Sequence, residues 1–147
     1  MAKPSRQRTP TRKAVPRRTR PTRSLAPSEP PDPRLIEGVQ LFNHGRFFEA
    51  HEVLEGLWRE TTDASKDFYK GLIQAAVACF HWSRGNLAGA QTLVQSATRY
   101  LKRYPSVYRG VEVGSFLERF VELFRWVKRL RQRYDARLVP HLRLIRS

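Results

Sequence analysis

The chain has 147 residues, 40% of them hydrophobic, and carries 28 lysine and arginine residues against 13 acidic residues, a formal net charge of +15. This length suits one domain, and no run of about 18 apolar residues is present that could form a transmembrane helix. The N-terminal residues also lack the apolar run of a secretory signal. Because Cys79 is the single cysteine, an intramolecular disulfide is excluded, and the sequence suits a reducing, cytoplasmic setting.

Proline and positive charge concentrate in the N-terminal part of the chain. Residues 1–34 hold eight of the ten prolines and ten basic residues, with Glu29 and Asp32 as the only acids. The few apolar side chains there cannot repay the entropy of ordering the segment. We therefore predict that residues 1–31 form a disordered basic arm and that residues 32–147 form one helical domain.

Three roles of this arm stay open. The arm has no aromatic residue to stack on bases, so it would attract nucleic acid or another polyanion nonspecifically, through charge alone. The second role is a solubilising tail. The third is an organelle transit peptide, because the segment is rich in arginine and contains serine and threonine. The candidate polyanion-binding residues of the arm are Arg17, Arg18 and Arg20.

From Asp32 onward, the spacing of apolar residues predicts one helix after another. Asp32 and Pro33 are typical of an N-cap and the first helical residue, and Gly45 suits the left-handed cap that ends a helix. The four predicted helices cover residues 33–44, 46–60, 66–84 and 87–103. The pair Gly45 and Ala50 recurs forty residues later as a second glycine and alanine, which indicates two similar helical hairpins.

The third predicted helix, residues 66–84, is apolar nearly all round, which is typical of a helix at the centre of a bundle. Ser115 and Glu118 have the spacing of a capping box, which predicts a fifth helix from there to about Arg133. No segment alternates with a period of two, so no sheet is expected. The predicted fold class is all-α: a compact bundle of about five helices, made of two stacked hairpins and a closing helix, preceded by the disordered basic arm.

The second helix contains a histidine and two glutamates that could carry chemistry. His51 lies one turn before Glu55, about 5–6 Å away on the same face, and Glu52 lies further toward solvent. On the third helix, Gln74 and His81 share the polar side. If that side faces the second helix, these residues converge on one buried polar pocket; otherwise they belong to a solvated stripe.

Three interpretations of this cluster stay open. The first is structural, with His51 hydrogen-bonded inside the bundle, and the second is a binding site for a protein partner or a small ligand. The third is metal-dependent hydrolysis, in which His51, Glu55 and His81 would bind a divalent metal ion and Glu52 would be the catalytic base. A zinc site of that kind normally has three protein ligands.

The run LFNHGRFFEAHEVLEGLW, residues 41–58, resembles the signature of the domain of unknown function 309 family, as do GLIQAA, residues 71–76, and RGNLAGA, residues 84–90. The resemblance covers about residues 38–104. It implies a compact helical fold and no known activity. It also implies a site at the matching residues Glu49, His51, Glu52, Glu55, Trp58, Gln74 and His81.

The fifth predicted helix has a strongly basic face. Arg125, Lys128, Arg129 and Arg133 share it, either as a solvated surface or as a polyanion-binding patch that works with the arm. The sequence as a whole favours a helical binding or interaction module with a buried His–Glu cluster. A metal-dependent hydrolase and a nonspecific nucleic-acid-binding protein are the two alternatives, so whether the protein is an enzyme stays open.

Overall fold

The computed structural model describes residues 31–145. The predicted arm therefore lies outside the described residues except for Pro31, and so do Arg17, Arg18 and Arg20. Five α-helices make up most of the described part: α1 (Pro33–Asn43), α2 (Phe47–Glu60), α3 (Ser65–Ser83), α4 (Leu87–Leu101) and α5 (Val113–Leu130). The all-helical fold class predicted from the sequence is confirmed. Within residues 31–145 no helix is long and apolar enough to cross a membrane.

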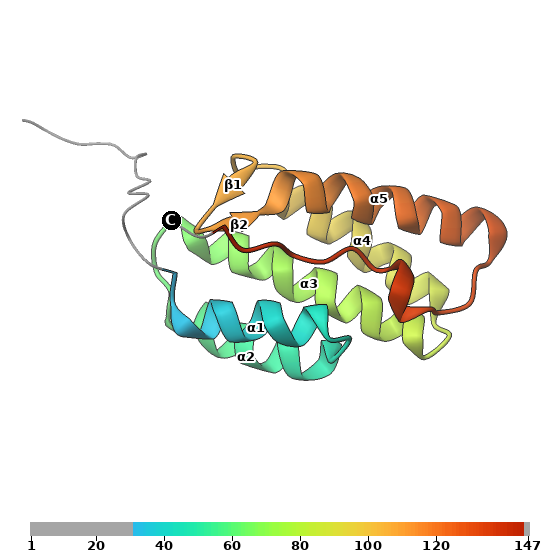
Figure 1. The fold of residues 1–147 in the computed structure, drawn as a ribbon, viewed down its shortest axis with the longest axis horizontal. Coiled ribbons are helices and arrows are strands. Elements are labelled where there is room, and N and C mark those ends of the chain that lie inside the picture. The colour runs from blue at the N-terminus through green and yellow to red at the C-terminus, as the bar shows by residue number, and fades with distance from the viewer. Residues whose placement is uncertain (1–30, 146–147) are drawn as a thin grey trace, which may run out of the picture. The chain divides into compact units, whose positions relative to one another are not determined.

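The caps predicted at Asp32 and Gly45 are present. The side chain of Asp32 accepts a hydrogen bond from the backbone N–H of Arg34 at 2.8 Å, and that of Asn86 caps α4 in the same way. Gly45 and Gly85 have φ angles of 77° and 79°, which are left-handed angles that a side chain disfavours. Each of these two turns joins the helices of one antiparallel hairpin, α1–α2 and α3–α4 (Figure 1).

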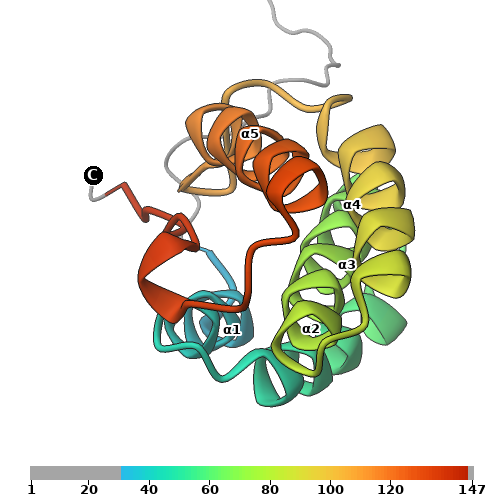
Figure 2. The same ribbon diagram turned by 90° about the vertical axis from the view of Figure 1, so that its right-hand side faces the viewer.

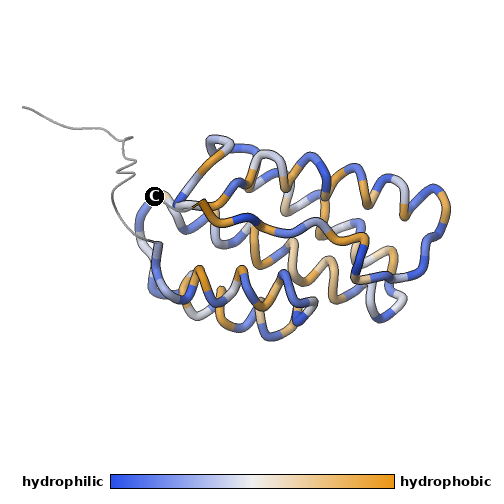
Figure 3. The backbone as a smooth tube through the Cα atoms, in the orientation of Figure 1, coloured by the Kyte–Doolittle hydropathy of each residue, from blue (hydrophilic) through white to orange (hydrophobic). Residues whose placement is uncertain are grey.

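The third helix is central, as predicted. It packs against α2 on one side and α4 on the other, and eleven of its nineteen residues are buried. Figure 2, which looks nearly along the helix axes, shows α1 to α5 in an arc, with the C-terminal segment between α1 and α5. Hydrophobic and hydrophilic segments are interspersed along α5 (Figure 3). Phe116, Phe120 and Phe124 are among its buried residues, at the spacing of one helix face.

The expectation of no sheet is wrong for one short region. Strands β1 (Val107–Tyr108) and β2 (Val111–Glu112) form an antiparallel hairpin whose turn residues, Arg109 and Gly110, have φ angles of 51° and 79°. Two positive φ angles are what the favoured two-residue hairpin turn requires. Strands this short leave no period-two pattern in the sequence, which is why the hairpin could not be predicted.

Three predicted helix ends are also corrected. Helix α5 begins at Val113, so Ser115 lies inside its first turn and the predicted capping box with Glu118 is wrong. It ends at Leu130 rather than Arg133, because Arg131 adopts a left-handed conformation with a φ of 51°. Helix α4 ends at Leu101 instead of Arg103.

The segment after α5 folds back onto the bundle. It contains a short 3-10 helix, Ala136–Leu138, and it is anchored by Asn43, whose side-chain amide exchanges two hydrogen bonds of 2.8 Å with the backbone of Leu142. The indole N–H of Trp82 donates to the carbonyl of Gln132 at 2.8 Å. We call these contacts the tail clamp. They make the C-terminal segment part of the fold.

Candidate functional site

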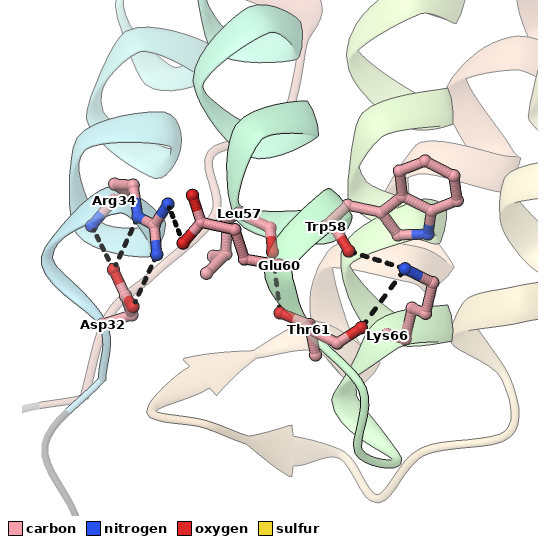
Figure 4. Close-up of polar contacts among 7 residues, drawn as sticks. All are labelled: Asp32, Arg34, Leu57, Trp58, Glu60, Thr61 and Lys66. Atoms are coloured by element: carbon pink, nitrogen blue, oxygen red, sulfur yellow. Dashed lines mark hydrogen bonds and ion pairs between the residues drawn. The ribbon is translucent and has the colours of Figure 1, made fainter.

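Helices α2 and α3 run antiparallel, and side-chain contacts fix their register at both ends. At one end the ammonium nitrogens of Lys66 and Lys70 lie 4.2 and 4.6 Å from the ring centroid of Trp58. Figure 4 shows this end, where Lys66 also donates to the Trp58 carbonyl at 2.8 Å. At the other end the rings of Phe48 and Phe80 lie 5.6 Å apart. We call the residues along this contact the α2–α3 seam: Phe48, His51, Glu55, Trp58, Lys66, Lys70, Gln74 and Phe80.

The structure brings His51 and Glu55 together within the seam. The Nε2 atom of His51 lies 3.6 Å from Oε1 of Glu55, and the His51 side chain is 24% exposed. Its other nitrogen, Nδ1, is buried and has no hydrogen-bond partner within the described residues. His51 is therefore a half-buried group with one weak contact and one unsatisfied polar atom.

Gln74 is in a similar situation on α3. Its Oε1 atom is buried without a donor among residues 31–145. It lies one turn from Lys70, on the face of α3 that borders α2. The polar side of α3 thus contributes an unsatisfied acceptor to the seam.

His81 does not join His51 and Glu55. Its Nδ1 atom lies 3.4 Å from the side-chain amide of Asn86, the residue that caps α4, so the turn between α3 and α4 holds this imidazole. Residues 31–145 contain no group of three His, Cys, Asp or Glu side chains that could hold a metal ion. The third ligand that a zinc hydrolase needs is not supplied by this part of the chain.

The other glutamates of α2 lie apart from the pair. Glu49 bonds Arg46 at 3.0 Å, and a backbone hydrogen bond at the helix start, together with Arg46, lowers the pKa of Glu49 below its usual value. Glu52, the candidate catalytic base, is exposed and has no ion-pair partner within the described residues. Cys79 is buried, and that burial raises the pKa of its thiol, which fits an inert core residue.

Sequence reasoning missed Phe48, which is 48% exposed and whose ring lies 5.5 Å from the His51 ring. One signal could have found it. An aromatic residue at position 48 falls outside the apolar face of α2 and shares the margin with Glu52 and Glu55. Lys66 and Lys70 were missed for another reason: their place depends on how α3 packs against Trp58.

The comparisons with known proteins agree with the resemblance noted in the sequence, which is confirmed. Residues 35–93 match the family model described as a domain of unknown function, DUF309. An uncharacterized protein of Aquifex aeolicus is 33% identical over 81 residues, which are 54% of this chain and 24% of that protein. The uncharacterized protein YpuF of Bacillus subtilis is 39% identical over 83 residues, 55% of this chain and 46% of YpuF. The matched segments cover less than half of each of these relatives, and neither name states an activity.

Proposed function

We propose, on the premise that residues 35–93 belong to the DUF309 family, that this protein is a non-catalytic helical binding module whose partner docks on the α2–α3 seam. One observation carries the proposal: the buried Nδ1 of His51 and Oε1 of Gln74 have no hydrogen-bond partner within the described residues. An unsatisfied buried polar group costs about 1–3 kcal/mol. Buried polar groups in native proteins are mostly hydrogen-bonded, so a partner that supplies the missing hydrogen bonds fits these two atoms.

The chemistry of the two atoms defines what the partner must bring. Oε1 of Gln74 can only accept a hydrogen bond, whereas an imidazole ring nitrogen such as Nδ1 of His51 can donate or accept one. Both side chains are only partly buried, so rotation about their terminal torsions can present these atoms to a partner. The partner therefore offers at least one N–H or O–H donor, which Gln74 accepts.

The test compares the same substitution at two glutamines. We expect Gln74→Met to raise the free energy of unfolding by about 1 kcal/mol, because it removes an unsatisfied acceptor. The matched control is Gln91→Met, which should lower it by about 1 kcal/mol, because the Gln91 amide donates to the Phe124 carbonyl at 3.0 Å. Urea unfolding of both variants measures these two changes in the free energy of unfolding. A loss of stability for Gln74→Met as large as that for the control would assign Gln74 to the fold and overturn the proposal.

A second proposed function is polyanion binding at the end of α5. Arg125 pairs with Glu122 at 2.9 Å, whereas Lys128, Arg129 and Arg133 are exposed and pair with no acid among residues 31–145. Part of this charge stabilises the C-terminal end of the helix. The rest of this positive charge is available to bind phosphate groups, together with the basic residues of the predicted arm.

The proposed setting of both functions is the cytoplasm. Its support is the single, buried thiol of Cys79, which fits a reducing compartment. Imaging of the full chain with a fluorescent C-terminal tag tests this setting, and accumulation in an organelle would contradict it.

A further inference from the structure

Three aromatic rings border the α2–α3 seam, and two of them hold cations. Trp58 has the ammonium groups of Lys66 and Lys70 over its ring, and the Arg84 guanidinium lies 5.1 Å from the Phe80 centroid. Cations are attracted to the negative face of such rings. Phe48 is the exception: this residue is 48% exposed, and its ring holds no cation among residues 31–145.

Carboxylates with unused hydrogen-bonding capacity flank this ring. Phe48, Glu52 and Glu55 recur four and seven residues apart, so they share one face of α2 with His51. Glu52 is exposed without an ion-pair partner in the described part of the chain. Glu55 has two contacts, to His51 and Arg59, both at 3.6 Å, which is beyond hydrogen-bonding distance.

We propose that this face of α2 binds the guanidinium group of an arginine on a partner protein. The planar guanidinium stacks on the Phe48 ring and donates hydrogen bonds to the carboxylates of Glu52 and Glu55. Arginine suits this place better than lysine, because its flat group both stacks on an aromatic face and presents five donors in a fixed geometry. The inference rests on the proposed function, since it names the chemistry of the partner that docks on the seam.

The neighbouring charges allow this binding. Lys66 and Lys70 lie beside Trp58, one turn along α2 from Glu55, but both ammonium groups lie over the Trp58 ring, and that of Lys66 also donates to the carbonyls of Trp58 and Thr61. Two further positive groups lie near this face: Arg84, on the adjacent Phe80 ring, and Arg59, 3.6 Å from Oε1 of Glu55. His51 also faces Oε1, so Oε2 of Glu55 and the exposed carboxylate of Glu52 are the groups that the incoming guanidinium can reach.

The test uses the full chain labelled with nitrogen-15 and the peptide acetyl-Gly-Arg-Gly-amide. We expect the peptide to shift the backbone amide signals of residues 48–55. A citrulline peptide, which has nearly the same shape and no charge, should bind at least fivefold more weakly, and a lysine peptide at least threefold more weakly. Glu52→Gln should weaken arginine binding at least threefold. The matched control, Glu118→Gln, changes an exposed carboxylate on α5 and should have no effect.

Equal binding of the arginine and citrulline peptides, or of the arginine and lysine peptides, would overturn the guanidinium site. So would equal effects of Glu52→Gln and Glu118→Gln. Failure of this inference is separable from failure of the proposed function. If Gln74→Met stabilises the protein while no peptide binds, the seam remains the proposed docking surface and only its ligand is wrong.

Discussion

The tail clamp and the α2–α3 seam each contain a side-chain amide, and the two amides differ in how many hydrogen bonds they make. In the clamp, the Asn43 amide uses both its oxygen and its nitrogen, each in a 2.8 Å hydrogen bond to Leu142. In the seam, the Gln74 oxygen is buried without a donor among residues 31–145. Buried polar groups in native proteins are mostly hydrogen-bonded. The contrast is between a polar group whose hydrogen bonds hold the fold together and one that the fold leaves without a donor, and it supports the proposal that the seam serves binding.

The largest expected effect is at the clamp. Asn43→Leu leaves the backbone N–H and C=O of Leu142 without partners, so we expect a loss of about 1–3 kcal/mol in the free energy of unfolding. Amide hydrogen exchange at Leu142 should accelerate more than exchange in α3. A variant as stable as the parent chain, with unchanged exchange, would show that the clamp contributes nothing and would remove the comparison.

A smaller effect concerns the start of α1. Hydrogen bonds from the side chain and then the backbone of Arg34 lower the pKa of Asp32. A pKa that is lower in the folded than in the unfolded state gives stability that is present above the unfolded value, about 3.9, and is lost as the pH falls through the folded value. Between about pH 5 and pH 2, Asp32→Asn should therefore lose stability less steeply than the parent chain, by about 1 kcal/mol in total. Parallel curves of unfolding free energy against pH would contradict this role.

At the seam, removal of the imidazole should cost little. His51→Ala removes a ring whose contact to Glu55 is 3.6 Å long and whose Nδ1 has no partner among the described residues. We expect a change in unfolding free energy below about 1 kcal/mol, less than for Asn43→Leu. Chemical denaturation of both variants side by side checks the order, and a reversed order would make His51 a structural residue.

The smallest effect should be at the end of α5. Substitution of both Arg129 and Arg133 by Gln should reduce the dependence of duplex-DNA binding on salt, by up to about 0.9 for each phosphate group that the variant no longer neutralises, while the arm retains most of the affinity. The slope is obtained by measuring the DNA affinity at several salt concentrations between about 50 and 200 mM. An unchanged slope would limit nucleic-acid binding to other residues.

Local signals made most of the helices predictable. Asp32, Asn86 and the two turn glycines act on residues within one turn of themselves, so their effect can be read from neighbouring positions. The hairpin and the tail clamp depend on contacts between distant segments. Val111 pairs with Leu144, and Asn43 forms a hydrogen bond with a residue 99 positions away. No periodic pattern in the sequence predicts such pairings.

The candidate site also has a part that local spacing predicts and a part that depends on packing between helices. The pairing of His51 with Glu55 follows from helical spacing alone and was predictable. The placement of Phe48 against Phe80 depends on the register of α2 and α3, which the sequence does not fix. Whether His81 joins the pair or lies on a solvated stripe could not be decided from the sequence, and the α3–α4 turn places its ring beside Asn86. Sequence patterns therefore predicted which residues share a face of α2, and packing determined which groups of α3 meet them.

The most direct test of the central claim is the unfolding free energy of the double variant His51→Leu with Gln74→Met, measured by urea denaturation of the full chain. We expect the double variant to be at least as stable as the parent chain, because two unsatisfied polar atoms are replaced by apolar groups. A loss of more than about 1 kcal/mol, with an unchanged denaturant slope, would contradict it. The seam would then be a structural element of the bundle.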